Sequence, residues 1–273
     1  MRIDIVSLFP EFFDAFFSHS IIKRAIEAER LSMGVTNPRD FSHNKHGQVD
    51  DTPYGGGAGM LMMAPPIFEA VESVIAQYDH TVNSTYTTDE ICDEMSLIGN
   101  PSESLRRRVI FMGPTGQPFT QEKARELATY DQLVLICGHY EGVDYRVEEH
   151  LVDETISIGD YVLTGGELPA MVVADAVARM IPGVLGAASG AQEDSFYEPL
   201  LECPQYTKPP EFRGWVVPDV LRSGHHKNIA TWRQKEALKR TRLLRPDLLE
   251  RPLTKEEVKL LKEIVAEELG YEI

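Results

Sequence analysis

Three glycine-bearing turns are the part of this sequence best suited to hold a small ligand. They lie at residues 113–116, at residues 138–142, and at Gly159 with residues 164–166, and each follows a run of apolar residues. Glycine lets the main chain approach a ligand closely, so backbone N–H and C=O groups from adjacent loops can bind an adenine, a ribose and a charged tail. One such turn is ordinary, whereas three of them after consecutive strands indicate a cofactor site.

Other motifs that could carry chemistry fail on their spacing. The glycine run at residues 55–59 matches neither G-x-x-x-x-G-K-[ST] nor G-x-G-x-x-G, so it is either a flexible loop tip or backbone packed against a flat ligand. His43 and His46, followed by Asp50 and Asp51, could form a metal site, but the nearby proline and glycines favour a polar loop over zinc. No G-x-S-x-G motif is present, which argues against a serine hydrolase. We expect no metal site from these residues.

The charge distribution points to a polyanionic partner for one segment. The chain carries 27 Lys and Arg against 43 Asp and Glu, a net charge of −16. Residues 222–246 hold eight basic residues against one acidic residue, whereas residues 141–203 hold thirteen acidic residues against two basic ones. Such asymmetry is a hint of nucleic acid binding, and a solvated helix face is the alternative.

Length and composition exclude several classes of protein. With 273 residues and 42% hydrophobic residues, the chain can form one large or two modest domains, and disorder of the whole chain is excluded. No window approaches the ~18 consecutive apolar residues of a membrane span, and residues 1–4 do not resemble a signal peptide. Cys92, Cys137 and Cys203 fit neither a disulfide framework nor a zinc site. We expect a cytoplasmic protein with no membrane partner.

The elements that must position the three turns alternate between strands and helices. Strands are expected at residues 108–112, 133–137 and 154–158, and helices at residues 121–130 and 168–180. This alternation predicts an α/β fold with a mostly parallel sheet covered by helices on both faces. Ligands of such sheets bind at the carboxyl ends of the strands, where all three glycine turns lie.

The segments before these strands are less regular. Residues 2–9 alternate and predict a strand, and residues 11–31 and 65–76 have apolar residues at helical spacing. Residues 38–60 are polar, glycine-rich and aperiodic, which is typical of a long functional loop. Residues 78–104 are polar without a sustained period and indicate an exposed insertion.

The C-terminal part has the pattern of a separate helical domain. Residues 186–191 are small and flexible, the composition of a linker, and residues 193–220 are proline-rich and aperiodic. Helices are expected at residues 228–244 and 254–269, and the second opens with the capping box Thr-Lys-Glu-Glu. We expect the domain boundary in the linker.

Seven motifs are spread over nearly the whole chain: SLFP at 7–10, PRDF at 38–41, VDDTPYGGGAGMLMM at 49–63, CGHYEGVD at 137–144, SIGDYVLTGGELPA at 157–170, IPGVLG at 181–186 and EDSF at 193–196. Together they resemble the bacterial tRNA (guanine-N1)-methyltransferase family. The resemblance implies a trefoil-knotted α/β methyltransferase domain of the SPOUT class over residues 1–186, a flexible linker over 187–194 and a helical tRNA-binding domain over 195–273. It also implies a homodimer with its active site at the subunit interface, acting on tRNA rather than DNA.

The implied reaction moves a methyl group from S-adenosylmethionine to base N1 of the guanosine 3′ of the tRNA anticodon, position 37. The family also suggests a magnesium requirement, for which the sequence shows no ligand cluster of its own. Carried over to this sequence, the cofactor-binding residues are Phe111, Met112, Gly113, Pro114, Thr115, Gly116, Gly138, Tyr140, Glu141, Ser157, Ile158, Gly159, Asp160, Tyr161, Val162, Leu163, Gly165, Gly166 and Pro169.

The resemblance also assigns residues to RNA binding and catalysis. Asp194 and Arg179 are the implied catalytic residues. The resemblance implies that the target base and the rest of the RNA are bound by Gly59, Ser223, His225, Arg233, Lys235 and Lys239. Tyr145 stands where the family usually has an acidic residue before Arg146, a departure that bears on the fine geometry of the cofactor loop.

The chemistry of the reaction is consistent with Asp194 and Arg179. Guanine N1 carries a proton at neutral pH, so a carboxylate at the attack site is needed as general base. As the proton leaves, negative charge accumulates toward O6 of the base, where a guanidinium fork can stabilise it. The alternatives are that Asp194 caps a helix or turn and that Arg179 pairs with a neighbouring carboxylate.

Two other functions stay open from the sequence alone. The chain could methylate another RNA with S-adenosylmethionine, or it could bind RNA without catalysis while keeping the same fold. Retention of Asp194, Arg179 and all three cofactor turns argues against the non-catalytic alternative.

Overall fold

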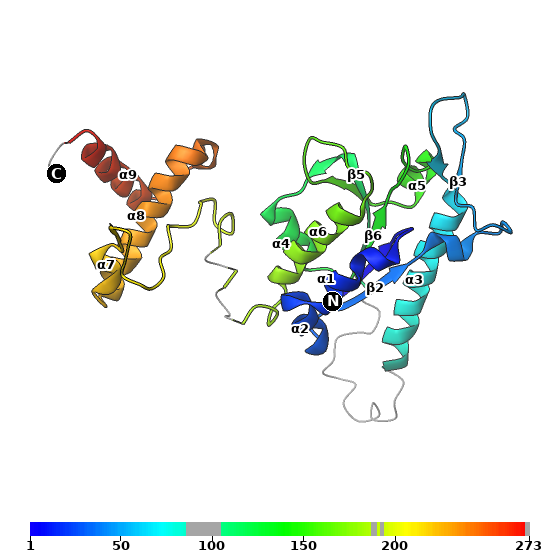
Figure 1. The fold of residues 1–273 in the computed structure, drawn as a ribbon, viewed down its shortest axis with the longest axis horizontal. Helices are drawn as coiled ribbons and strands as arrows, with labels where there is room; N and C mark the ends of the chain where they lie inside the picture. The colour runs from blue at the N-terminus through cyan, green and yellow to red at the C-terminus, as the bar shows by residue number, and fades with distance from the viewer. Residues whose placement is uncertain (86–104, 187–189, 192–193, 271–273) are drawn as a thin grey trace, which may run out of the picture. The chain divides into compact units, whose positions relative to one another are not determined.

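The computed structural model describes residues 1–85, 105–186, 190–191 and 194–270 (Figure 1). The chain divides into two compact units, Met1–Ala188 and Ser189–Ile273, and this division falls within the segment expected to be a linker. Most of the insertion expected at residues 78–104 lies outside the described residues. No helix in the described part of the chain is long and apolar enough to cross a membrane.

A five-stranded parallel sheet forms the centre of the first unit. Its strand order is β2 (Ser32–Thr36), β1 (Arg2–Val6), β6 (Gln132–Cys137), β5 (Arg107–Pro118) and β7 (Glu154–Ser157). All neighbouring pairs in this order are parallel. The parallel α/β sheet expected from the sequence is therefore confirmed. Strand order does not by itself describe a knot, so the trefoil knot stays a prediction.

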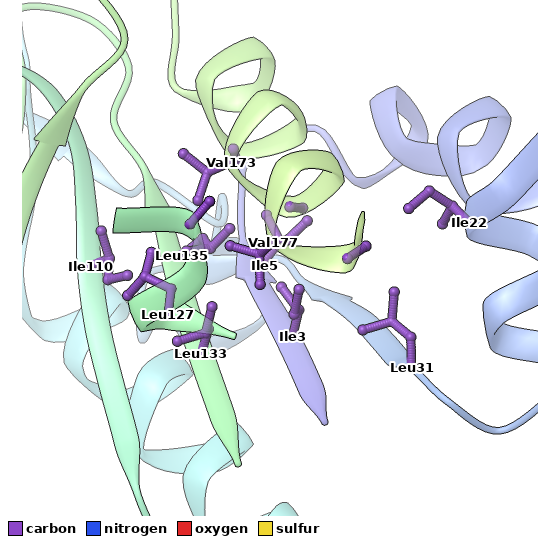
Figure 2. Close-up of a cluster of buried hydrophobic side chains, with 14 of the residues drawn as sticks. Ile3, Ile5, Ile22, Leu31, Ile110, Leu127, Leu133, Leu135, Val173 and Val177 are labelled. Atoms are coloured by element: carbon purple, nitrogen blue, oxygen red, sulfur yellow. The ribbon is translucent and has the colours of Figure 1, made fainter. Parts of the chain in front are cut away.

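One face of the sheet packs against α2 (Ser20–Glu27), α4 (Gln121–Leu127) and α6 (Glu167–Met180). Figure 2 shows Val173 and Val177 of α6 lying over strand residues that include Ile3, Ile5 and Leu135. Those three isoleucine and leucine side chains are fully buried. Alternate residues of a strand point to one face, so this apolar set fixes which face α6 covers.

The intervening strand residues form a second hydrophobic cluster on the opposite face. Val6, Val134 and Ile136 pack there against α3 (Ala64–Thr85) and α5 (Tyr145–His150). Both faces of the sheet are therefore covered by helices, as expected for a parallel sheet.

Helix α3 is longer than the sequence indicates. Apolar spacing predicts an end at residue 76, but the helix continues to Thr85. Tyr78 donates a hydrogen bond to the backbone oxygen of Asp131 at 3.4 Å, and Asp79 forms an ion pair with Arg107 at the start of β5. Polar contacts support these last turns, and the first residues of the expected insertion are helical.

Two elements of the sheet unit are not indicated by the sequence. β2 is half-buried and has Gly34 at its centre, so no hydrophobic alternation marks it. α5 has six residues, too few for a helical period, and begins after Asp144, whose side chain accepts a hydrogen bond from the Arg146 N–H. The remaining short elements are 3-10 helices at Pro10–Phe13 and Pro38–Phe41, α1 (Asp14–Ser18), and the antiparallel pair β3 (Asp50–Asp51) and β4 (Leu61–Met62).

Helices α8 (His226–Leu244) and α9 (Lys255–Glu268) form the core of the second unit, where Leu238 packs with residues of α9. The capping box expected at α9 is confirmed, because Thr254 and Glu257 each accept a hydrogen bond from the other's backbone N–H. The shorter elements are α7 (Asp219–Arg222), a 3-10 helix at Pro246–Leu249, and an antiparallel hairpin of β8 (Glu211–Phe212) and β9 (Trp215–Val216). The hairpin lies in the stretch that the sequence marks only as proline-rich and aperiodic.

Candidate active site

A pocket lies beside the middle of β5 and the ends of β6 and β7, and its wall comes from the three glycine turns and the start of α6. All of the residues expected to bind the cofactor line this pocket except Thr115, Gly116 and Asp160. Its wall also contains four residues that are not among the cofactor-binding residues named above: His139, Gly142 and Thr164, which lie in the expected glycine turns, and Ile156 of β7. The fold thus gathers the three turns at one edge of the sheet, which is where parallel sheets bind ligands.

The first turn lies within β5 rather than after it. Met112 and Gln117 both pair with Ile156 of β7, so the four residues between them leave the sheet register as a bulge. The first half of this bulge lines the pocket. A Cβ on Gly116, in its second half, would overlap the backbone of Thr155. Gly116 therefore allows the chain to pass close to β7 where β5 rejoins the sheet.

Two pocket glycines are also required for packing within the protein. A Cβ on Gly138 would lie 2.9 Å from the ring of Phe111, and one on Gly166 would lie 2.6 Å from Cα of Cys137. Both separations are closer than real Cβ atoms approach their neighbours. The absence of side chains lets the turn after β6 and the start of α6 pack together, which leaves main chain at the pocket wall.

A buried carboxylate supports one side of the pocket. Glu167, the first residue of α6, is 3% exposed and accepts a hydrogen bond from Ser7 Oγ at 2.6 Å. Its other oxygen lies 2.8 Å from Nε2 of His139, whose ring packs on Phe9 with 4.8 Å between ring centroids. The positive N-terminal end of α6 favours a negative charge at this position. Burial, together with this carboxylate, raises the pKa of the Cys137 thiol well above its ordinary value.

Gly59 lies beside the pocket, although it is distant in the sequence. The Glu141 N–H donates to the backbone oxygen of Met60 at 3.0 Å, which holds this loop against the pocket-lining turn. Gly59 has a φ of 81°, in the left-handed region, and a Cβ there would overlap the Glu141 side chain. Apart from their chain neighbours, none of the residues that the structure describes lies within 4 Å of a Cβ position on Gly55 or Gly56, so the start of the run is an open loop tip.

Arg179 and Asp194 belong to different units. Arg179 is half-buried in the last turn of α6, and its distance along the helix axis from the pocket-lining Pro169 is about 15 Å at 1.5 Å per residue. Asp194 lies near the start of the second unit, where its N–H donates to the backbone oxygen of Ala191 at 3.4 Å. The first unit brings the expected cofactor residues and Gly59 together around the pocket. Arg179 lies in the same unit but is not part of the pocket wall, and Asp194 lies in the second unit.

The basic segment of the second unit is partly neutralised by acidic residues outside it. Lys235 of α8 lies 2.6 Å from Glu267 of α9, and Arg242 lies 2.8 Å from Glu268. Arg233 and Lys239, also on α8, are exposed and form no ion pair with another described residue. Ser223 and His225, just before α8, are exposed as well, and Ser223 Oγ accepts a hydrogen bond from the His225 N–H at 3.2 Å.

Residues 1–251 match the family model described as tRNA (Guanine-1)-methyltransferase TrmD. The chain belongs to this family. It is 54% identical to the tRNA (guanine-N(1)-)-methyltransferase of Desulforamulus reducens, over 97% of this chain and 95% of that protein. The proteins of the same name from Brevibacillus brevis and Dehalococcoides mccartyi strain CBDB1 are 53% and 51% identical, over 98% of this chain and 99% and 98% of theirs. The resemblance carried by the seven motifs is confirmed.

The departure from the family pattern at Tyr145 lies away from the pocket. The Tyr145 side chain is exposed and is not part of the pocket wall. Its neighbour Arg146 forms an ion pair with Asp144 at 2.5 Å, and the hydrogen bond from Arg146 lowers the pKa of that carboxyl below its ordinary value. The helix cap at Asp144 is therefore intact beside the changed residue.

One histidine of the long loop contacts a carboxylate of α3. His43 Nε2 lies 2.8 Å from the carboxylate of Glu69 on α3. Within the described ranges, no group of three or more His, Cys, Asp and Glu side chains is arranged to hold a metal ion.

Proposed function

We propose that this chain is an enzyme that transfers a methyl group from S-adenosylmethionine to base N1 of the guanosine at position 37, 3′ of the anticodon, in tRNA. The observation that carries the proposal is the pocket formed by three glycine turns, one within β5 and two at the carboxyl ends of β6 and β7. Relatives matched over nearly their full length are named tRNA (guanine-N(1)-)-methyltransferases. Because its substrate would be tRNA, we place the reaction in the cytoplasm.

The residues of the pocket fit S-adenosylmethionine. Main-chain N–H and C=O groups of the turns suit its ribose and adenine edges, and Tyr161, Val162 and Leu163 offer exposed apolar surface for the adenine ring. The Glu141 carboxylate suits its positive charges. When bound, S-adenosylmethionine would supply a methyl group on a positively charged sulfur; attack by a nucleophile on that carbon would break the carbon–sulfur bond, and the electron pair would leave with the sulfur of neutral S-adenosylhomocysteine.

We assign proton transfer to Asp194 and charge stabilisation to Arg179. The Asp194 carboxylate would accept the proton that leaves guanine N1, which frees the N1 lone pair to form the new bond to carbon. The Arg179 guanidinium would donate hydrogen bonds to O6 as negative charge develops there. The family suggests a magnesium requirement as well, to which we assign no residue and no step.

We also propose that a second copy of the chain completes the active site. The distance along α6 between Pro169 and Arg179, about 15 Å, is longer than an arginine side chain, which favours an Arg179 donated by a partner. Leu168 and Val172 lie one turn apart on α6 and are 51% and 46% exposed, which is apolar surface suited to a subunit interface.

The proposed function is tested by methyl transfer to bulk tRNA, followed by nucleoside analysis and mapping of the modified position. The expected product is N1-methylguanosine at position 37. A product at another position, or transfer to other RNA in a parallel assay on total RNA but none to tRNA, would favour the alternative substrate. Absence of transfer, with RNA still bound, would favour the non-catalytic alternative.

The catalytic assignment is tested under single-turnover conditions with Asp194→Asn. Asparagine keeps the shape but lacks a carboxylate that can take the proton, so the rate should fall at least ~100-fold with cofactor affinity nearly unchanged. Arg179→Lys should also reduce the rate severely, because the point charge of an ammonium group cannot reproduce the planar fork of the guanidinium. Asp219→Asn is the matched control, since Asp219 is an aspartate of the second unit with a 97% exposed side chain. A tenfold or smaller loss in Asp194→Asn would move the base role to another carboxylate, with Glu141 or Asp160 tested next.

A further inference from the structure

The hairpin of β8 and β9 presents an aromatic pair at its tip. Phe212 pairs directly with Trp215 across the two-residue turn of Arg213 and Gly214. Both turn residues have positive φ, 53° and 84°, as in the type I′ turn whose twist suits a hairpin. Cross-strand partners lie on the same face of a hairpin, so the turn holds the two rings side by side.

The apolar side chains of this hairpin are unusually exposed. Trp215 is 70% exposed, Phe212 is 56% exposed, and Val216 is 55% exposed. A two-stranded hairpin is at best marginally stable in water by itself, and grouped exposed aromatic residues mark binding surfaces. These exposures favour a partner that covers the hairpin tip.

The chemistry of the tip fits an unpaired nucleic acid base. The Arg213 guanidinium lies 5.1 Å from the centroid of the Phe212 ring, and the Phe212 and Trp215 centroids are 6.2 Å apart. Aromatic rings and arginine planes are the groups on which unstacked RNA bases stack. The same unit carries Arg233 and Lys239, which are exposed and form no ion pair with another described residue, and such charges suit a polyanion better than an apolar protein surface.

We propose that Phe212, Arg213 and Trp215 form a stacking platform for an unpaired base of the RNA substrate. The proposal rests on the proposed function for the identity of that RNA, and it adds a contact to the basic residues of α8. A base stacked on Trp215 would help to hold a single-stranded loop, whereas a fully paired helix would offer it no open base face.

The first experiment uses fluorescence. The chain has two tryptophans, so Trp232→Phe leaves Trp215 as the only one. An RNA stem-loop with an unpaired loop should quench Trp215 emission, and a duplex of equal charge should not. Equal quenching by both RNAs, or by neither, would overturn the platform. RNA affinity of Trp232→Phe measured against the unaltered chain controls for the background substitution.

The second experiment uses function and separates this proposal from the proposed function. Trp215→Ala should raise KM for tRNA about tenfold, the order of one lost base stack, while kcat and S-adenosylmethionine affinity stay unchanged. Trp215→Phe should largely restore KM, because it keeps an aromatic face. If the unaltered chain transferred methyl groups and Trp215→Ala kept the same KM, the platform alone would be wrong.

A third measurement tests whether protein covers the tip instead. If a second copy of the chain occupied it, Trp215 emission would change with protein concentration in the absence of RNA, and Trp215→Ala would alter sedimentation. That result would overturn the RNA platform. Unchanged sedimentation together with loop-specific quenching would support it.

Discussion

At the scale of single residues, Glu167 shows how the pocket is held in shape. One carboxylate joins three separate parts of the chain: Ser7 after β1, His139 after β6, and its own position at the start of α6. A buried carboxylate with two hydrogen-bonded partners holds both partners in place, because breaking either hydrogen bond leaves a polar group unsatisfied away from water. The turn that carries Tyr140 and Glu141 is therefore anchored through His139.

We predict that Glu167→Ala weakens S-adenosylmethionine binding about tenfold or more and lowers thermal stability. The substitution leaves Ser7 and His139 without their buried partner, and each unsatisfied group costs about 1–3 kcal/mol. Glu167→Gln should lose less, since an amide can accept from His139 and donate to Ser7. Calorimetric titration of both variants checks this. Unchanged affinity in Glu167→Ala would show that the anchor does not shape the pocket.

At the scale of elements, helix α9 begins with an ion pair built into its cap. The Glu257 carboxylate accepts from Arg251 at 2.6 Å and from the Thr254 N–H at 2.7 Å. The hydrogen bond from Arg251 is the largest of the effects that lower the pKa of Glu257 from 4.5 to about 2. Because this pKa is lower in the folded state than in the unfolded chain, Glu257 stabilises the fold above pH 4.5.

We predict that this stabilisation is lost as pH falls from about 4.5 to about 2. The shift corresponds to a loss on the order of 3 kcal/mol in the free energy of unfolding of the second unit. Both tryptophans lie in that unit, so denaturant unfolding followed by tryptophan emission at several pH values reports on it. Arg251→Gln should flatten the pH dependence. If the free energy of unfolding changed with pH equally in the variant and the unaltered chain, groups other than Glu257 would control the acid sensitivity.

Helix α8 carries basic residues that form ion pairs and others that form none within the described part of the chain. We predict that Arg233→Ala with Lys239→Ala weakens tRNA binding and reduces the slope of log affinity against log salt concentration by about two, one phosphate contact for each charge. Lys235→Ala is the matched control, because Lys235 already pairs with Glu267 and should change the slope less. Filter binding over a range of salt concentrations measures this. An unchanged slope in the double variant would move the main electrostatic contact off α8.

At the scale of the whole molecule, the composite active site that we propose would require two copies of the chain. We predict a dimer at micromolar concentration by sedimentation, with an interface on the order of 2,000 Å² or more. Leu168→Asp with Val172→Asp should shift the chain toward monomer and abolish methyl transfer, because charges would replace apolar surface at α6. A monomeric unaltered chain with full activity would contradict the composite site.

The sequence predicted the parts of the fold whose residues carry strong periodic signals. The buried strands β5, β6 and β7 and the apolar helix α6 follow from their patterns, and the parallel sheet follows from their alternation. β2 could not be predicted, since an edge strand with half-buried residues lacks such a pattern. The β8–β9 hairpin, with two residues in each strand, is too short to show any alternation.

The candidate site was predictable where glycines mark turns, and less so where residues act through contacts distant in sequence. His139 and Glu167 both lie within quoted motifs, but nothing in their spacing shows that they pair. The one signal in the sequence was Glu167 itself, a charged residue directly after two glycines and at the start of an apolar helix. The pairing of Lys235 with Glu267 was equally invisible, because its partner lies outside the basic segment.

The bulge in β5 has a consequence for how pockets of this kind can diverge. The strand leaves the sheet at Met112 and returns at Gln117 opposite the same partner, Ile156, so the sheet register does not depend on how many residues lie between. Insertions or deletions at residues 113–116 would reshape one wall of the pocket, while β7 and the helices that cover the sheet would keep their positions. Ligand preference can therefore evolve at this point through loop length alone, without a compensating change in the scaffold.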